Sequence, residues 1–156
     1  MNAASGNARP RLSLEISAQE TLIGASDGRV WRLPVGTRSL WTPSAAGPSA
    51  VAVEQGIQTV EDAIERVARQ VPRGAVLVPT HDLLWPLRRN GAIASQTQGS
   101  IGADDIEREY QWLAARAAGA PSARGTGFDA PAGDALVLIL RELMHHLGVV
   151  SLALAD

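Results

Sequence analysis

The stretch AVAVEQGIQTVEDAIERVARQVPRGAVLV, residues 50–78, decides the fold class. Residues 50–53 form a short apolar run that predicts a strand, and residues 75–78 predict a second, buried strand. Between them, Thr59 has the residue type of a helix N-cap. The apolar positions that follow recur at helical spacing: Val60, Ile64, Val67 and Val71. Strand, helix and strand within about thirty residues are typical of a βαβ unit, whose strands are parallel.

Upstream of this unit the sequence alternates with a period of two, which predicts strands. Leu12, Leu14 and Ile16 alternate with polar residues. Residues 21–25 and 29–35 then flank Asp27-Gly28, a dipeptide that favours the type I′ turn of a hairpin. The same turn matches the G-x-S-x-G motif of hydrolases, but a strand pattern follows it where that motif needs a helix. We therefore expect an N-terminal β-meander.

Downstream, two helices and a strand complete the predicted domain. Asp104 with Glu107 opens one helix, and a second runs from about residue 134 to residue 147. The first half of that last helix is apolar all round, so it is expected between layers or in an oligomer interface. Residues 149–154 predict a final buried strand. The fold class is α/β, with α+β as the alternative: a β-meander followed by a βαβ unit in a mixed sheet, with helices packed on the sheet.

The domain organisation follows from composition along the chain. Residues 1–10 lack periodicity and predict a disordered tail. Residues 11–156 predict a single domain, with flexible loops at 42–49 and 119–133, where Pro, Gly and Ser gather. The N-terminus lacks the basic and apolar regions of a signal peptide, so we expect a cytoplasmic protein.

Composition excludes several kinds of chemistry. Fourteen basic residues, all of them Arg, stand against sixteen acidic ones, giving a net charge of −2. Without Cys there is no disulfide, thiolate nucleophile, zinc finger or iron–sulfur cluster. Without Lys there is no Schiff base and no P-loop. The charge also makes nucleic-acid binding unlikely.

His81 and Asp82 are the candidate catalytic pair. They come directly after the strand predicted at 75–78, at the end where open α/β sheets bind ligands. There His81 would act as acid or base, with Asp82 orienting its ring. The alternative is that Thr80 caps a short helical turn and Asp82 favours its positive end.

Four further residues are the candidate ligand-binding set for an anionic metabolite: Ser95, Thr97, Ser100 and Arg124. The first three lie in the loop that precedes the helix opened by Asp104. Arg124 lies in the Gly-rich loop at 119–133, which a guanidinium could use to close over an anion. Disorder of that loop is the competing interpretation.

The last helix offers one weak metal motif. Glu142 lies three residues before His145 and four before His146, so its carboxylate could share a metal with one of the two imidazoles, which point about 100° apart on the helix. The donors outside this helix that would complete such a site are Asp104, Asp105 and His81. We interpret the histidines as helix-end residues that interact with the dipole, and we expect no metal and no cofactor.

The function with most support from the sequence is a non-catalytic binding or assembly module that forms a homo-oligomer. Its contact surface would be residues 83–87, an apolar segment interrupted by Pro86, together with the last helix. That segment is equally explained as a plug at the end of the core. The alternative function is a small-molecule enzyme or ligand-binding domain that acts on an anionic metabolite with His81 as its acid or base.

Overall fold

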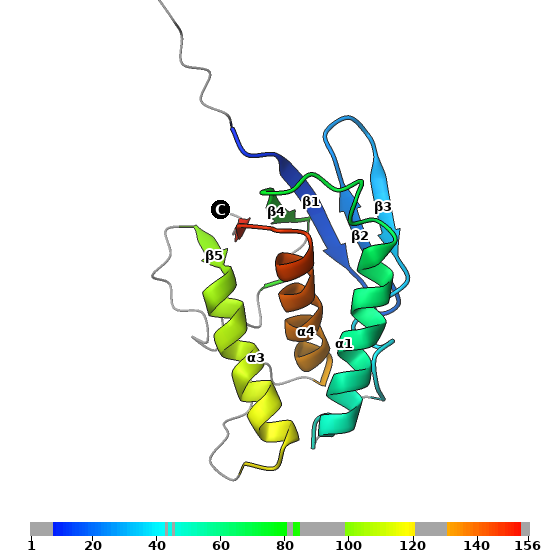
Figure 1. Cartoon of the computed structure of the whole chain (residues 1–156), viewed down its shortest axis with the longest axis vertical. Helices are drawn as coiled ribbons and strands as arrows, with labels where there is room; N and C mark the ends of the chain where they lie inside the picture. The colour runs from blue at the N-terminus through cyan, green and yellow to red at the C-terminus, as the bar shows by residue number, and fades with distance from the viewer. Residues whose placement is uncertain are drawn as a thin grey trace, which may run out of the picture.

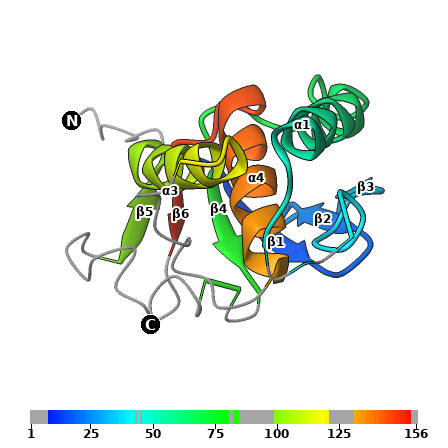
Figure 2. The same cartoon turned by 90° about the horizontal axis from the view of Figure 1, so that it is seen from below.

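The structure, a computed structural model, describes residues 8–42, 44, 46–80, 83–84, 99–120 and 131–153. Six strands form one mixed sheet in the order β3-β2-β1-β4-β6-β5. Their bounds are Arg11–Ile16 (β1), Thr21–Gly24 (β2), Val30–Leu33 (β3), Val76–Pro79 (β4), Ser100–Gly102 (β5) and Ser151–Ala153 (β6). Helices α1 (Ala50–Glu65), α3 (Ala103–Ala117) and α4 (Pro131–His146) lie on one side of this sheet (Figures 1 and 2).

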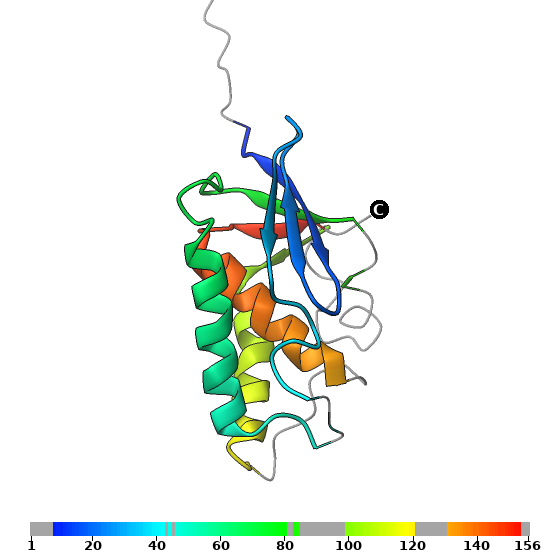
Figure 3. The ribbon, with the colours of Figure 1, turned by 90° about the vertical axis from the view of Figure 1, so that its right-hand side faces the viewer.

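The strand directions confirm the predicted α/β fold with a mixed sheet. β1, β2 and β3 pair antiparallel, as expected of the meander. β1 pairs parallel with β4, and β4 pairs parallel with β6, whereas β5 is antiparallel to β6. In the side view of Figure 3 the helices form a second layer beside the twisted sheet.

The hairpin between β2 and β3 has a different turn from the predicted one. Gly28 N donates to Ala25 O over 3.1 Å, Ala25 N donates to Arg29 O over 2.8 Å, and Gly28 has a positive φ, of 88°. This is the three-residue loop in which a type I turn is followed by a left-handed glycine, whereas a type I′ turn needs two residues with positive φ. Asp27 stabilises it by accepting hydrogen bonds from Arg29 N and Nε.

Residues 50–53 are the first turn of α1, so the strand predicted there is wrong. Ser49 is the N-cap, and its hydroxyl accepts from Ala52 N over 3.1 Å. Thr59, predicted as the cap, lies inside the helix and donates its hydroxyl to Gln55 O. An alternating apolar run of four residues fits the start of an amphipathic helix as well as a strand. The parallel partner of β4 is β1 instead.

β5 is a strand where the sequence predicts a loop. Three residues, Ser100–Gly102, pair with β6 at the edge of the sheet. Three residues are too few to show an alternation of apolar and polar side chains, so the polar composition of this segment led to the prediction of a loop. α3 begins immediately afterwards, where the Asp105 carboxylate accepts from Gly102 N over 3.1 Å.

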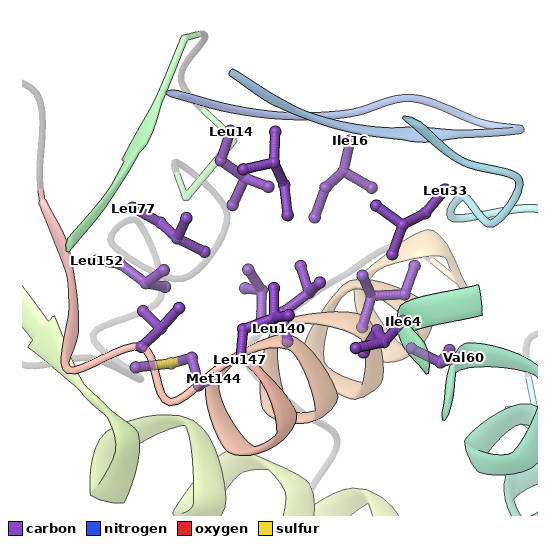
Figure 4. Packing of buried hydrophobic residues seen from close by; sticks show 14 of the residues in the cluster. Leu14, Ile16, Leu33, Val60, Ile64, Leu77, Leu140, Met144, Leu147 and Leu152 are labelled. Atoms are coloured by element: carbon purple, nitrogen blue, oxygen red, sulfur yellow. The ribbon is translucent and has the colours of Figure 1, made fainter. Parts of the chain in front are cut away.

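The core lies between the sheet and the helices. Figure 4 shows strand residues such as Leu14 and Leu77 pointing toward Leu140 and Leu147 of α4 and toward Ile64 of α1. Every side chain from residue 135 to residue 140 is buried, which confirms that this half of α4 lies between layers. Among the described residues, no helix has the length and apolar character needed to cross a membrane.

Residues 83 and 84 belong to the same core. Leu84 is 3% exposed and lies in the main cluster, and Leu83 packs against that cluster. These two residues fit the alternative that this segment plugs the end of the core. Residues 85–87 lie outside the described part of the chain, and the homo-oligomer stays a prediction.

Candidate functional site

Three parallel strands end on one edge of the sheet, which we call the carboxyl edge. β1, β4 and β6 run in the same direction, and their last residues are Ile16, Pro79 and Ala153. β2 follows β1 on one side of the β1–β4 pair, whereas β5 and β6 follow β4 on the other side. Open α/β sheets bind ligands outside the carboxyl ends of their strands at such a reversal of strand order. The carboxyl edge beside β1 and β4 is therefore the candidate site.

The turn between β1 and β2 forms one wall of this edge. Ser17 N donates to Glu20 O over 2.9 Å, and the Ser17 hydroxyl accepts from Glu20 N over 3.2 Å. The turn is thus closed by its own backbone and by one hydroxyl. Glu20 forms an ion pair with Arg32 of β3. This pair compensates the carboxylate of the turn, so the turn presents little net negative charge to an anion.

The loop after β3 is bound to that turn. Thr37 N donates to Ser17 O over 3.0 Å, and Arg38 N donates to Ala18 O over 2.8 Å. Gly36 makes this approach feasible, because a Cβ there would come within 2.5 Å of the backbone of Ala18. Arg38 is exposed, and within the described part of the chain it forms no ion pair. The contact therefore places the backbone of Arg38 at the carboxyl edge, and its guanidinium has no ion-pair partner in the described part of the chain.

The sequence analysis overlooked Arg38. A signal for it exists in the chain, since β3 is antiparallel to β2 and therefore ends on the same edge as β1. A residue that closely follows β3 must therefore lie near the carboxyl edge. That argument requires the pairing of β1 with β4, which a single sequence does not supply.

Thr80 directly follows β4 at the centre of the edge. Its N–H and its hydroxyl both donate to Leu14 O, over 2.9 and 3.4 Å, and its side chain is exposed. These bonds continue the β1–β4 pairing to the end of the strand. His81 and Asp82 come next in the chain but lie outside the described residues, so their acid–base role stays a prediction.

Of the predicted ligand-binding residues, the structure describes one. Ser100 begins β5 and pairs with Ala153, the last residue of β6, so it lies on the carboxyl edge. β6 separates it from β4, which puts the two strands roughly 10 Å apart. Ser95, Thr97 and Arg124 lie outside the described residues, and binding by all four stays a prediction.

The weak metal motif of the last helix has a third member that the sequence analysis overlooked. His146 Nε2 lies 3.1 Å from Glu142 Oε2 and 3.2 Å from Oε1 of Glu61, which comes from α1. Asp104 and Asp105, the donors considered from the sequence, do not belong to this group. Only the packing of α1 on α4 brings Glu61 there, and no spacing in the sequence signals it.

Solved structures share the fold of this chain, although no protein-family model and no curated protein sequence matches it. The PPX-GPPA enzyme of Aquifex aeolicus is similar with a TM-score of 0.66 at 13% identity, over 94% of this chain and 53% of the other. The type II variant of the Aquifex aeolicus Ppx/GppA phosphatase gives 0.63 at 13%, over 97% and 55%. An exopolyphosphatase from Cytophaga hutchinsonii gives 0.57 at 12%, over 99% and 55%.

This likeness corrects the predicted function. The sequence analysis favours a non-catalytic binding or assembly module, whereas these neighbours are a phosphatase and an exopolyphosphatase. That prediction was wrong because much of the apolar surface that supported it, at Leu84 and in the first half of α4, belongs to the core. The alternative, an enzyme or ligand-binding domain for an anionic metabolite, fits these neighbours better. The chain spans about half the length of the neighbours and is similar in fold to that half of a Ppx/GppA enzyme.

Proposed function

We propose that this chain is a domain of a phosphatase-type enzyme that binds a polyanionic, phosphate-containing substrate at the carboxyl edge of β1 and β4. The observation that carries this proposal is the likeness in fold to the Aquifex aeolicus and Cytophaga hutchinsonii enzymes over 94–99% of the chain. Inorganic polyphosphate is the first substrate to test, because one of these neighbours is an exopolyphosphatase.

The charges along the edge support an anionic ligand. Glu20 is compensated by Arg32, whereas Arg38 carries a positive charge without an ion-pair partner in the described part of the chain. A guanidinium binds phosphate oxygens through two parallel N–H donors, which gives both attraction and orientation. The hydroxyl of Thr80 adds a polar group directly after β4, next in the chain to the predicted acid–base residue His81.

The chemistry of the chain narrows the reaction. Without cysteine or lysine, hydrolysis of a phosphoanhydride is most simply carried out by a water molecule. The water oxygen forms a bond to the terminal phosphorus, the bond from phosphorus to the bridging oxygen breaks, and a base takes the proton of the water. In this proposal His81 is that base, and Arg38 binds the substrate, since phosphoryl transfer depends mainly on positioning and charge compensation.

Because the chain spans about half the length of its neighbours, binding and turnover are measured separately. Calorimetric titration with polyphosphate should show binding that weakens as salt rises, because the attraction is largely electrostatic. Arg38→Gln should lower the affinity about tenfold, as expected for the loss of one charge-assisted contact. Where phosphate release is measurable, His81→Gln should lower kcat by about 10²–10⁴-fold with little change in KM.

The matched control is Arg29→Gln. Arg29 is also an exposed arginine, but it follows β2 at the hairpin, on the opposite edge of the sheet, and it pairs with Asp27. The Arg29→Gln variant should bind polyphosphate as the wild type does. Equal losses in Arg29→Gln and Arg38→Gln would mean that binding is non-specific, and absence of binding at low salt would refute the proposal.

A cytoplasmic location and self-association through residues 83–87 and the last helix are part of this proposal as well, although Leu84 and the first half of α4 are themselves buried in the core. Cell fractionation tests the first. Light scattering over a range of protein concentrations tests the second, and a strict monomer would contradict it.

A further inference from the structure

The group formed by Glu61, Glu142 and His146 lies far from the proposed substrate edge. His146 is at the C-terminal end of α4. Gly148 lies between α4 and β6, and its carbonyl oxygen accepts a hydrogen bond from Gly74 N, which lies just before β4. This is the edge at which the parallel strands begin. The helices α1 and α4 lie side by side there (Figure 1). The group therefore has no part in the reaction proposed above.

The geometry of the group is unusual for hydrogen bonds alone. Two carboxylate oxygens, Glu61 Oε1 and Glu142 Oε2, face the same ring nitrogen of His146 at 3.2 and 3.1 Å. That nitrogen carries at most one proton, which can point well at one acceptor only. All three ligand atoms lie within 4.8 Å of one another. One N–H thus serves only one of the two carboxylate oxygens well.

A metal ion satisfies all three atoms at these distances. Zn²⁺ binds nitrogen at about 2.0–2.1 Å and carboxylate oxygen at about 2.0–2.2 Å, so tetrahedral ligands lie about 3.4 Å apart. The separations of 3.1 and 3.2 Å from His146 Nε2 to the two carboxylate oxygens are close to this value, and the two oxygens lie within 4.8 Å of each other. Glu142 and His146, four residues apart on one helix, supply two ligands from a single face.

Neighbouring residues hold Glu142 in position, as residues that hydrogen-bond to a metal ligand do. Its carboxylate is 2% exposed, and its other oxygen, Oε1, accepts from Arg141 Nη1 over 2.5 Å. Arg141 in turn donates to Glu107 Oε2 over 2.8 Å and lies 4.0 Å above the ring of Tyr110. Residues that bind the non-ligating atom of a ligand fix its orientation toward a metal. Oε2 is left directed at His146.

Charge and access also favour a cation. Around Arg141 and His146 the three carboxylates of Glu61, Glu107 and Glu142 face one guanidinium, which leaves two negative charges uncompensated when His146 is neutral. A cavity of about 350 Å³ opens onto Glu61 and His146, with Asp62 and Glu65 in its wall. It gives an ion a path from solvent and leaves room for water to complete its coordination.

We propose that Glu61, Glu142 and His146 bind a divalent transition-metal ion, with Zn²⁺ as the expected occupant, and that this ion links α1 to α4. One imidazole with two carboxylates favours Zn²⁺ over Mg²⁺ and Ca²⁺, which prefer sets made of oxygen alone. With three protein ligands, water takes the fourth position. The site is a structural link rather than part of the phosphatase chemistry, so it stands or falls independently of the proposed function.

The test is titration of the full chain with Zn²⁺ in competition with a chromogenic chelator. The wild type should bind one equivalent. His146→Ala and Glu61→Gln should each lower the affinity by at least about tenfold, since even loss of an outer-shell partner costs 10–100-fold. His145→Ala is the matched control, because His145 is the neighbouring histidine but lies outside the group, and it should bind like the wild type.

Thermal unfolding gives a second readout. At a Zn²⁺ concentration about 100 times the Kd, the unfolding midpoint should rise by roughly 5–10 °C in the wild type and in His145→Ala, and much less in Glu61→Gln. Glu61 is partly exposed, so its isosteric change to Gln tests the site without disturbing the fold. Equal Zn²⁺ affinity in Glu61→Gln, His146→Ala and the wild type overturns the proposal, as does absence of stoichiometric binding. A larger shift with Mg²⁺ than with Zn²⁺ overturns the choice of metal.

Discussion

At Gly36 the lack of a side chain allows two loops to touch. The loop after β3 packs its backbone against Ala18 in the β1–β2 turn, and a methyl group at residue 36 would come within 2.5 Å of three backbone atoms. Backbone cannot move aside as the end of a flexible side chain does. Arg38, two residues later, is placed at the carboxyl edge by this contact.

Gly36→Ala should therefore lower the free energy of unfolding by about 2–3 kcal/mol, as overpacking does, and it should also weaken polyphosphate binding. Gly74→Ala is the comparison. Residue 74 has a φ of +73° but nothing within 4 Å of a Cβ, so that change should cost only about 1 kcal/mol and leave binding unchanged. Urea unfolding and calorimetric titration of both variants measure the two effects. Equal losses would show that the contact with Ala18 is unimportant.

Among the elements, α1 shows what a hydrophobic pattern can and cannot predict. The spacing of Val60 and Ile64 predicts its second half, because that half packs on the core. The first half packs less evenly, with Val53 buried and Val51 66% exposed. Two valines two residues apart fit a strand, and Thr59 has the residue type of a cap, so the predicted start of the helix lies ten residues too late.

Replacing each candidate cap by alanine separates the two assignments. Ser49→Ala should lower the free energy of unfolding by about 1 kcal/mol, because the hydroxyl that accepts from Ala52 N is lost. Thr59→Ala should be neutral or slightly stabilising, because Thr59 lies inside the helix, where alanine is favoured. Chemical denaturation of both variants provides the measurement, and a larger loss in Thr59→Ala would contradict the assigned start of α1.

Across the whole molecule, ion pairs connect the three helices. Glu107 of α3 bonds to Arg141 of α4, Arg141 bonds to Glu142, and His146 joins Glu142 to Glu61 of α1. Burial alone would raise the pKa of Glu107, but hydrogen bonds from Arg141 and Gln111 outweigh it, so the pKa lies below its ordinary value. The bond between Glu107 and Arg141 is thus expected to weaken in acid.

The pH dependence has a definite sign. Because the folded pKa of Glu107 is lowered, its stabilising contribution is complete above the unfolded pKa of about 4.3 and is lost as the pH falls through the folded pKa. At pH 7, Glu107→Gln should be less stable than the wild type by about 0.5 kcal/mol, a value that allows for its partial exposure. This difference should shrink below about pH 4.

Urea unfolding at several pH values measures that difference. Glu15→Gln, which removes an exposed carboxylate of β1 without an ion pair in the described residues, serves as the control. If the difference in the free energy of unfolding between Glu107→Gln and the wild type instead grows as the pH falls, the pKa of Glu107 is not lowered by folding.

The strand order marks the limit of prediction at this scale. The meander, β4, α3, α4 and β6 follow from local patterns, and so does the expectation that ligands bind beyond β4. The pairing of β1 with β4 joins residues such as Leu12 and Leu77, which are far apart in the sequence, and no local pattern encodes it. Arg38 and Glu61 reach their sites through such distant contacts, so the sequence analysis could not select them.

The position of β6 has a consequence for how the protein is made. β6 is the last strand in the described part of the chain, yet it lies between β4 and β5 in the sheet. While the ribosome is still adding residues before Ser151, β5 has no strand to pair with, and β4 has an open edge on the side away from β1. Open edges attract other chains, and the domain folds as a unit. The sheet can therefore close only after synthesis has passed Ala153, which leaves the nascent chain dependent on protection until that moment.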